Sequence, residues 1–344
     1  MTKYKYSKSS SFYFDYKKNF FQENEHEYSK AIQINKLYSS QPKRKYCKLC
    51  SEPLNTNIFD FKSHNVEYQF CVSCNHLNGM HDETNEFFNS MYIEDDGVSY
   101  SVTYIDNNYQ SRVNDVYMPK LNLMIDHLNN SKDLKYLDIG CGAGHLVSAG
   151  ISKNLNIEGI DVGAKMVKFG NSQIELIHNK TNMLKSVDSF DFHSVMNDNY
   201  DVISLIGVME HLQDLEIFFD AFKSSKAQYL FFSVPMFSPS VVFENVFENV
   251  FPRQLSSGHT HLFTEESLKV LFEKLNVKSI VEWRFGTDIM DLLRSCLTQA
   301  SIKNSSSKFN NSITTKISPI VDKLQNTLDE HHFCSEIHCL VKKI

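Results

Sequence analysis

The chain has 344 residues, of which 42% are apolar, and a formal net charge of −6. This length exceeds that of one small domain, so we expect one main globular domain with appendages and a sizeable core. The negative charge argues against a dedicated nucleic-acid-binding protein, because such proteins usually present a basic face. No stretch approaches the ~20 apolar residues of a membrane span, and the polar start is unlike a signal peptide. We therefore expect a cytoplasmic protein, and the sequence indicates no oligomeric state.

The N-terminal segment is basic and rich in tyrosine. Residues 1–46 hold ten Lys or Arg against four acidic residues, with aromatic residues between them. We interpret this segment as a partly ordered arm, because chain termini are commonly polar and loosely packed. Binding of nucleic acid or of an anionic surface is the alternative.

Four cysteines fall in two Cys-x-x-Cys pairs, Cys47 with Cys50 and Cys71 with Cys74. Two such pairs about 20 residues apart suit a tetrahedral zinc site, because each turn offers two thiolates to one ion. Four protein ligands close the site, so the role of the zinc would be structural. Two unrelated thiol pairs are the alternative. His64 and His76 are conceivable substitute ligands, although solvated or substrate-facing positions are favoured for both.

Residues 134–146 combine a short apolar strand with a glycine-rich turn. The strand is followed by Gly140, Gly142 and Gly144, and a helix is predicted over 145–154. Glycines at the end of a strand let the backbone turn tightly and approach a ligand closely. The Gly-x-Gly-x-Gly spacing differs from both the dinucleotide fingerprint and the P-loop. Such a unit is typical of the start of a nucleoside-binding α/β domain.

A second strand, residues 157–161, ends in Asp161. This acid lies about 20 residues beyond the first glycine, the offset at which an acid binds ribose hydroxyls. A glycine turn in some other α/β protein, with Asp161 as a helix cap, is the alternative. Residues 138–144, with Asp138 ahead of the glycines, resemble the first motif of the class I S-adenosylmethionine (SAM)-dependent methyltransferases. Residues 159–161 resemble the second motif of that family.

This resemblance implies a fold and a cofactor site. The fold class would be α/β, a Rossmann-like methyltransferase with a mostly parallel seven-stranded sheet and helices on both faces. A helical segment before the glycine loop would cover the cofactor, with Arg112 pairing with the methionine carboxylate. Residues 189–192 resemble the end of a third strand that holds adenine, and a surface loop is the equally weighted alternative. The implied SAM-binding residues are Asp138, Gly140, Cys141, Gly142, Gly144, Asp161, Val162, Asp191, Phe192, Ile206 and Arg112.

A buried strand is predicted at residues 200–207, and Glu210 and His211 follow it. They therefore stand at the edge of the sheet where open α/β proteins bind ligands. The segment resembles the fourth motif of the family, which implies that both side chains line the site beside the transferable methyl group. The alternatives are that Glu210 complements a helix dipole and that His211 packs internally.

Residues 236–276 form a long insert between two predicted strands, and inserts at the ligand edge are usually functional lids. The lid carries His259 and His261 in a segment that resembles the His-x-His-Leu-Phe sequence of one branch of these methyltransferases. Imidazoles titrate near neutrality, so either histidine is a first candidate for a general base, with His211 next. Alternatively, one histidine only orients the lid. A metal is not expected, because His-x-His has no obvious third ligand in the sequence.

The remaining sequence predicts a strand at 277–285, a helix from 286, a flexible connection at 301–315, a helix near 320–328 and a strand at 336–341. The predicted organisation is a basic, tyrosine-rich arm (1–40), a zinc-knuckle module (41–95), a helical cap (96–130) and a methyltransferase core (131–344) with its lid (236–276).

The resemblance implies a SAM-dependent methyltransferase of class EC 2.1.1. A cysteine module before such a core resembles the N-terminal zinc-binding domain of sugar C-methyltransferases. We therefore expect a small-molecule acceptor, foremost a sugar, nucleotide-sugar or surface-glycan precursor of polysaccharide biosynthesis. The expected cofactors are SAM and a structural Zn²⁺. The alternatives are a methyltransferase that reaches RNA or protein through its basic arm and zinc module, and a non-catalytic SAM-binding protein.

Overall fold

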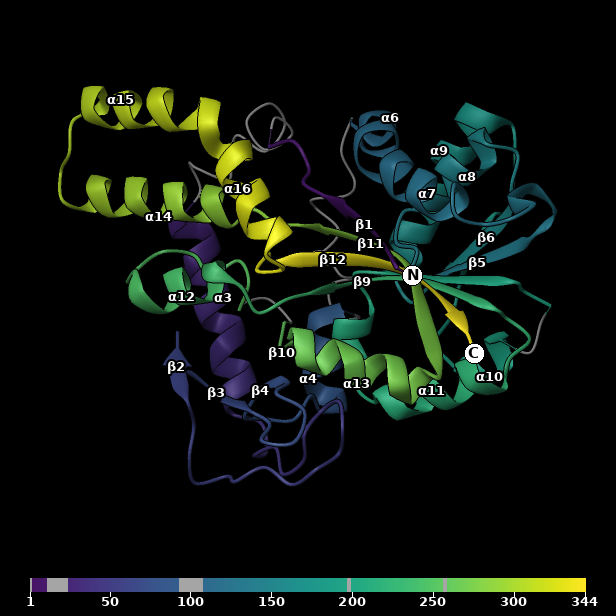
Figure 1. The fold of residues 1–344 in the computed structure, drawn as a ribbon, viewed down its shortest axis with the longest axis horizontal. Helices are drawn as coiled ribbons and strands as arrows, with labels where there is room; N and C mark the ends of the chain where they lie inside the picture. The colour runs from purple at the N-terminus through teal and green to yellow at the C-terminus, as the bar shows by residue number, and fades with distance from the viewer. Residues whose placement is uncertain (1, 11–23, 93–107, 197–198, 256–258) are drawn as a thin grey trace.

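The computed structural model describes residues 2–10, 24–92, 108–196, 199–255 and 259–344 (Figure 1). Residues 96–107 of the predicted cap and the start of the Gly-His-Thr-His segment lie outside these ranges. A central sheet has eight strands where seven were predicted. In spatial order they are β1 (Lys3–Tyr6), β11 (Val277–Phe285), β12 (Glu336–Lys343), β9 (Tyr229–Pro235), β8 (Val202–Ile206), β5 (Lys135–Ile139), β6 (Asn156–Asp161) and β7 (Leu184–Ser186).

The sheet is mostly parallel. The exception is β12, which runs antiparallel to both of its neighbours, β11 and β9. The eighth strand, β1, comes from the N-terminal segment that was interpreted as a loose arm, and it pairs in parallel with β11. Trp283 on β11 holds it there, because its indole N–H donates to the Ser7 carbonyl at 2.8 Å and its ring lies under the Lys5 ammonium. Lysines on a short edge strand also discourage further strand pairing.

Helices cover both faces of this sheet (Figure 1). Along β5, Leu137 and Ile139 enter the apolar core on one face, whereas Tyr136 enters the core on the other. Burial on both faces explains why these strands are almost continuously apolar. On the first face lie α10 (Phe192–Met196), α11 (Leu215–Ser224) and α13 (Glu265–Leu275). On the second lie α6 (Tyr109–Arg112), the π-helical turn η2 (Val113–Tyr117), α7 (Met118–Ile125), α8 (His145–Ser152) and α9 (Ala164–His178).

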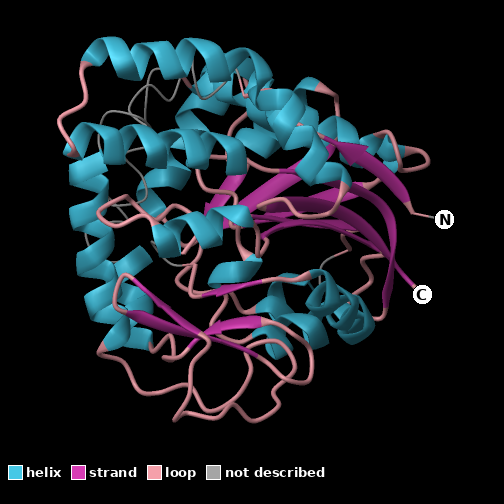
Figure 2. Cartoon of the chain, turned by 60° about the vertical axis from the view of Figure 1, so that its left-hand side comes forward, coloured by secondary structure: helices cyan, strands magenta, loops and turns pink. Residues whose placement is uncertain are grey.

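A second, four-stranded sheet forms the lower part of the molecule (Figure 2). Three strands come from the predicted zinc module: β2 (Phe61–Ser63), β3 (Val66–Phe70) and β4 (Leu77–Gly79). The fourth, β10 (His261–Leu262), belongs to the lid and pairs antiparallel with β4. The helix α3 (Asn24–Ser39) packs beside β3, and α4 (Asn85–Tyr92) follows the module. The module and the lid therefore share one sheet.

Several predicted elements have different bounds in the structure. Residues 301–315, predicted to be flexible, include most of α15 (Ser307–Ile317), which Ser306 caps by accepting from the Phe309 N–H. It stands between α14 (Asp288–Ile302) and η5 (Ser318–Ile320) with α16 (Val321–Glu330). Residues 189–191 form a loop before α10, since the third strand, β7, ends earlier. The lid contains α12 (Pro239–Val246), and Thr264 forms the expected cap of α13.

No helix among the residues that the structure describes has the length and apolar character needed to cross a bilayer.

Candidate functional site

The glycine loop lies directly after β5, and its backbone has positive φ angles that residues with a Cβ adopt only at a cost. Gly140 and Gly142 have φ values of +71° and +53°, in the left-handed region that glycine enters at little cost. A Cβ on Gly140 would lie only 2.4 Å from Cγ2 of Val208. The absence of a side chain thus allows Val208, at the end of the neighbouring strand β8, to pack on the loop.

Asp161 fixes this loop from the end of β6. Its Oδ2 accepts from the Gly142 N–H and its Oδ1 from the Gly163 N–H, both at 2.7 Å. The side chain is largely buried, and burial raises its pKa, while the backbone N–H groups of Gly163 and Gly142 oppose that shift. Each carboxylate oxygen can accept a second hydrogen bond. Asp161 can therefore hold the loop and still accept from a ligand hydroxyl.

A cavity of about 540 Å³ lies over the carboxyl ends of the parallel strands. Its walls contain residues 140–143 after β5, 161–163 after β6, 206–208 after β8 and 233–235 at the end of β9. This is the ligand-binding edge of open α/β sheets, and the volume falls in the usual range for small-molecule sites, roughly 300–1,000 Å³.

Seven of the predicted cofactor residues line this cavity and four do not. Those that line it are Gly140, Cys141, Gly142, Asp161, Val162, Phe192 and Ile206. Asp138 is buried beneath the loop, where its Oδ1 accepts from the Ser204 hydroxyl at 2.7 Å, and burial raises its pKa to about 7. Asp191 is exposed and accepts from the Ser194 N–H near the start of α10. Gly144 caps α8, and Arg112 ends α6 outside the cavity wall.

Polar side chains gather at one end of the cavity. Glu210 and His211 form the short 3₁₀ turn η4 (Met209–His211) after β8, and His259 reaches the same cavity from the lid. Glu210 is 5% exposed, and burial raises its pKa to about 8. The His211 and His259 rings have centroids 5.6 Å apart. Burial also lowers the pKa of His259 to about 4, so this imidazole is neutral at pH 7.

The second lid histidine lies elsewhere. His261 is fully buried in β10, where its Nδ1 is 2.8 Å from Nε2 of His76 and shares a hydrogen bond with it. His76 also bonds the Ser267 hydroxyl, so neither of these histidines is solvated or faces the cavity. Of the two lid histidines predicted as bases, only His259 reaches the cavity. It lies in the loop before β10, whereas His261 is the first residue of that strand.

Sequence reasoning missed four charged residues of the cavity wall, Lys120, Asp214, Arg253 and Glu336. Lys120 lies in the mostly apolar helix α7, and its Nζ is 5.1 Å from the Tyr117 ring centre. Burial lowers its pKa to about 8. Glu336 begins β12 and accepts from the His338 Nε2–H at 2.6 Å. Because β12 is antiparallel, its first residue meets the carboxyl end of β9 at Pro235. A polar residue at the start of a final antiparallel strand is the signal that could have found it.

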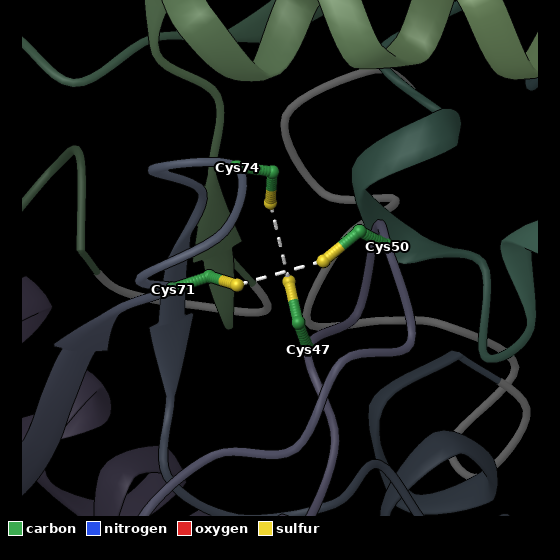
Figure 3. A group of neighbouring side chains, drawn as sticks. All are labelled: Cys47, Cys50, Cys71 and Cys74. Carbon is green, nitrogen blue, oxygen red and sulfur yellow. Dashed lines mark hydrogen bonds between the residues drawn. The ribbon is translucent and has the colours of Figure 1, made fainter.

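The four predicted zinc ligands lie together in the module (Figure 3). The sulfur atoms are 3.6 Å apart between Cys47 and Cys74 and 3.5 Å apart between Cys50 and Cys71. All four sulfur atoms lie within 4.8 Å of one another, and none forms a disulfide. Four thiolates at ~2.3 Å from a tetrahedral Zn²⁺ have sulfur–sulfur separations of ~3.8 Å. The arrangement fits such an ion.

A family model described as "Methyltransferase domain" matches residues 109–281, half of the chain. No curated protein matches. Among solved structures, the magnesium protoporphyrin IX methyltransferase of Synechocystis with bound SAH is 12% identical, with 76% of this chain and 100% of that chain covered and a TM-score of 0.48. Geranyl diphosphate C-methyltransferase of Streptomyces coelicolor is 12% identical, with 70% and 85% covered and a TM-score of 0.43. A SAM-dependent methyltransferase of Archaeoglobus fulgidus is 18% identical, with 69% and 100% covered and a TM-score of 0.42.

Because the family model spans half of the chain and its segment contains the parallel strands β5 to β9 and the glycine loop, the chain belongs to the methyltransferase domain family, whose fold is that of SAM-dependent enzymes.

Proposed function

We propose that the cavity binds SAM along the glycine loop and that the protein transfers the methyl group to a small-molecule acceptor at the polar end. The observation that carries this proposal is the position of Asp161. It stands at the carboxyl end of β6, faces the cavity, and keeps accepting capacity on both oxygens. That geometry suits a ribose, with the glycine backbone beside the ligand and the apolar residues Val162, Met166 and Phe192 beside an adenine.

When bound, SAM supplies an electrophilic methyl group on a sulfonium. The protein has to align acceptor and methyl group for in-line displacement and to exclude water. An acceptor hydroxyl also has to lose a proton. His259 suits this role because its Nδ1–H donates to the Gln254 carbonyl at 3.1 Å, which leaves the Nε2 lone pair for an incoming proton. His211 and Lys120 line the same end of the cavity.

The acceptor that we propose is rich in hydroxyl groups, such as a sugar, nucleotide-sugar or surface-glycan precursor. Two observations support this class. The acceptor end carries carboxylate, imidazole and amide groups that hydrogen-bond hydroxyls, foremost Glu210, Glu336, His259 and Gln254. A four-cysteine module precedes the core, as in the sugar C-methyltransferases that the sequence resembles.

We further propose that the four cysteines hold a structural Zn²⁺. The sulfur spacing supports this assignment, and a site closed by four protein ligands leaves no position for a substrate. The ion would stabilise the module, whose strand β4 pairs with β10 of the lid. Zinc would thereby help to hold the lid residue His259 at the cavity.

Calorimetric titration with SAM and S-adenosylhomocysteine tests the cofactor assignment. The wild type should bind both, and Asp161→Asn, which removes the charge but keeps the volume, should bind at least about tenfold more weakly, a loss of about 1.4 kcal/mol. Asp191→Ala is the matched control, since this acid was predicted to bind SAM but lies outside the cavity. No binding by folded, zinc-loaded wild type would refute the proposal. Labelled SAM with glycan precursors then tests the acceptor class.

A further inference from the structure

Three metal-ligating side chains converge at the polar end of the cavity. Glu210, His211 and His259 each offer one ligand atom, and these atoms all lie within 4.8 Å of one another. Two of them come from η4 after the central strand β8, and the third comes from the lid. The sequence did not indicate this cluster, because its members lie far apart in the chain and no third ligand was found for the His-x-His pair. In the structure His261 points elsewhere, and His259 lies instead beside Glu210 and His211 of η4.

Glu210 is buried without a direct ion pair within the described ranges, although the charge of Lys120 acts on it from a greater distance. Its Oε2 has no hydrogen-bond partner among the residues that the structure describes, and no ion pair of that part of the chain includes this carboxylate. An ionised carboxylate in such a position is costly unless it is paired or binds a metal. A cation in contact with Oε2 would remove this cost.

His259 is oriented as metal-bound histidines usually are. Its Nδ1–H donates to the backbone carbonyl of Gln254 at 3.1 Å, which fixes the tautomer with the lone pair on Nε2. A backbone carbonyl or carboxylate on the distal nitrogen is the common outer-shell arrangement of a metal-ligating imidazole.

The neighbouring charged side chains contact other groups and, in the part of the chain that the structure describes, form no ion pair with the cluster. Arg253 lines the same end of the cavity, and its guanidinium pairs with Asp291 at 2.7 Å. Lys120 lies over the Tyr117 ring, and Glu336 is bonded to His338. The cluster therefore combines one carboxylate and two imidazoles with a second carboxylate, that of Glu336, in the same cavity.

We infer that Glu210, His211 and His259 form a binding site for a divalent transition-metal ion whose remaining coordination positions face the acceptor. Two nitrogen ligands and one oxygen ligand favour Mn²⁺, Fe²⁺, Co²⁺ or Zn²⁺ over Mg²⁺ and Ca²⁺, which prefer oxygen ligands. Three protein ligands leave open positions, as in metal sites that bind substrate. With an ion bound, Nε2 of His259 holds the ion and does not take up the acceptor proton. The binding of acceptor oxygens at the ion rests on the proposed function; the binding of the ion itself does not.

Titration of the full-length, zinc-loaded protein with Mn²⁺ tests this inference, with free Mn²⁺ followed by electron paramagnetic resonance. Mn²⁺ prefers oxygen and nitrogen ligands and competes poorly with zinc for thiolates, so the four-cysteine site does not interfere. We expect one site per wild-type chain. Glu210→Gln, His211→Ala and His259→Ala should each weaken binding by at least about 100-fold, the upper end of what loss of an outer-shell partner costs. His193→Ala, which removes an exposed histidine of α10, should bind like the wild type.

Calorimetry with S-adenosylhomocysteine on the same samples separates the two proposals. Wild-type protein that binds S-adenosylhomocysteine but no Mn²⁺ would overturn the metal site and leave the proposed function standing. Mn²⁺ binding that is equal in the wild type and the three ligand variants would also overturn it. Mn²⁺ binding that the ligand variants lose, in a protein that binds no S-adenosylhomocysteine, would support the metal site and refute the proposed function. Glu210→Gln is nearly isosteric and removes a buried ionisable group, so it should unfold at the same temperature as the wild type or at a higher one, which excludes misfolding.

Discussion

Gly140→Ala should destabilise the protein by about 2–5 kcal/mol. The left-handed backbone at this position, with φ of +71°, costs a residue with a Cβ about 1–2 kcal/mol. The new methyl group would also lie 2.4 and 3.1 Å from the two Cγ atoms of Val208, and overpacking of this kind costs about 1–3 kcal/mol. Both costs arise at the cavity wall, so affinity for S-adenosylhomocysteine should fall as well.

A double-mutant cycle with Val208→Ala separates the two costs. Val208→Ala alone removes two methyl groups, about 1.6 kcal/mol at ~0.8 kcal/mol for each. It leaves only the Cβ of residue 208, which would lie 3.4 Å from a Cβ at position 140. In the double variant the steric cost disappears while the backbone cost remains. The coupling energy should therefore be favourable by about 1–3 kcal/mol.

Equilibrium urea unfolding measures this cycle, with fluorescence of the single tryptophan, Trp283 on β11, as the signal. A loss of less than about 1 kcal/mol in Gly140→Ala would contradict the left-handed backbone and the packing together. A coupling energy near zero would contradict the contact between the loop and Val208 alone.

Three further predictions concern buried charges and the four-cysteine module. Asp138→Asn should stabilise the protein more at pH 8 than at pH 5 in urea unfolding, because the carboxyl has a pKa of about 7 when folded and about 3.9 when unfolded. The wild type then loses stability as the pH rises from 4 to 7, and an equal effect at both pH values would disprove the assignment. Cys74→Ser should contain one zinc per chain less than the wild type by elemental analysis. It should also speed hydrogen exchange of the Gly79 N–H, which donates to the Thr260 carbonyl at 2.7 Å. Unchanged exchange would refute the link between the cysteine site and the lid. Glu83→Gln should cost about 3–5 kcal/mol, because it leaves buried Lys48 without its ion-pair partner and Arg44 with only the more distant Asp82. Glu67→Gln, in a more exposed pair, should cost less than about 1 kcal/mol by thermal unfolding.

The sequence predicted elements best where local pattern and tertiary burial agree. The segment at Tyr229 is a nearly continuous apolar run, and the segment at Val277 is rich in β-branched and aromatic residues; the structure forms a strand from each. The same holds for the cap at Thr264, where both hydrogen bonds of the capping box form. The strand β1 could not be predicted in this way, because Lys-Tyr-Lys-Tyr is polar and its pairing with β11 depends on tertiary contacts such as that with Trp283.

The site residues that the sequence predicted are likewise those set by local order along the chain. The glycine loop and Asp161 stand at fixed offsets within one β-α-β unit, so their joint presence in the cavity follows from local order. Lys120 and Glu336 enter the cavity from a cap helix and from the last strand, and only the topology of the sheet brings them there. The lid histidines show that proximity in sequence is not enough. Only one residue lies between His259 and His261, yet only His259 reaches the cavity, because β10 begins at His261.

The pairing of β4 with β10 has a consequence for the order in which the chain folds. The Thr264 hydroxyl donates to the Asn75 carbonyl across a sequence separation of 189 residues. The cysteine turns are local, with Cys47 and Cys74 only 27 residues apart, and can gather around an ion early. The fourth strand of their sheet is synthesised only after most of the large sheet has emerged. Non-local pairings of this kind pay a large loop-closure entropy and form slowly. We therefore expect closure of the small sheet to be a late folding step. Until β10 pairs with it, the open edge of β4 is exposed to pairing with strands of other chains.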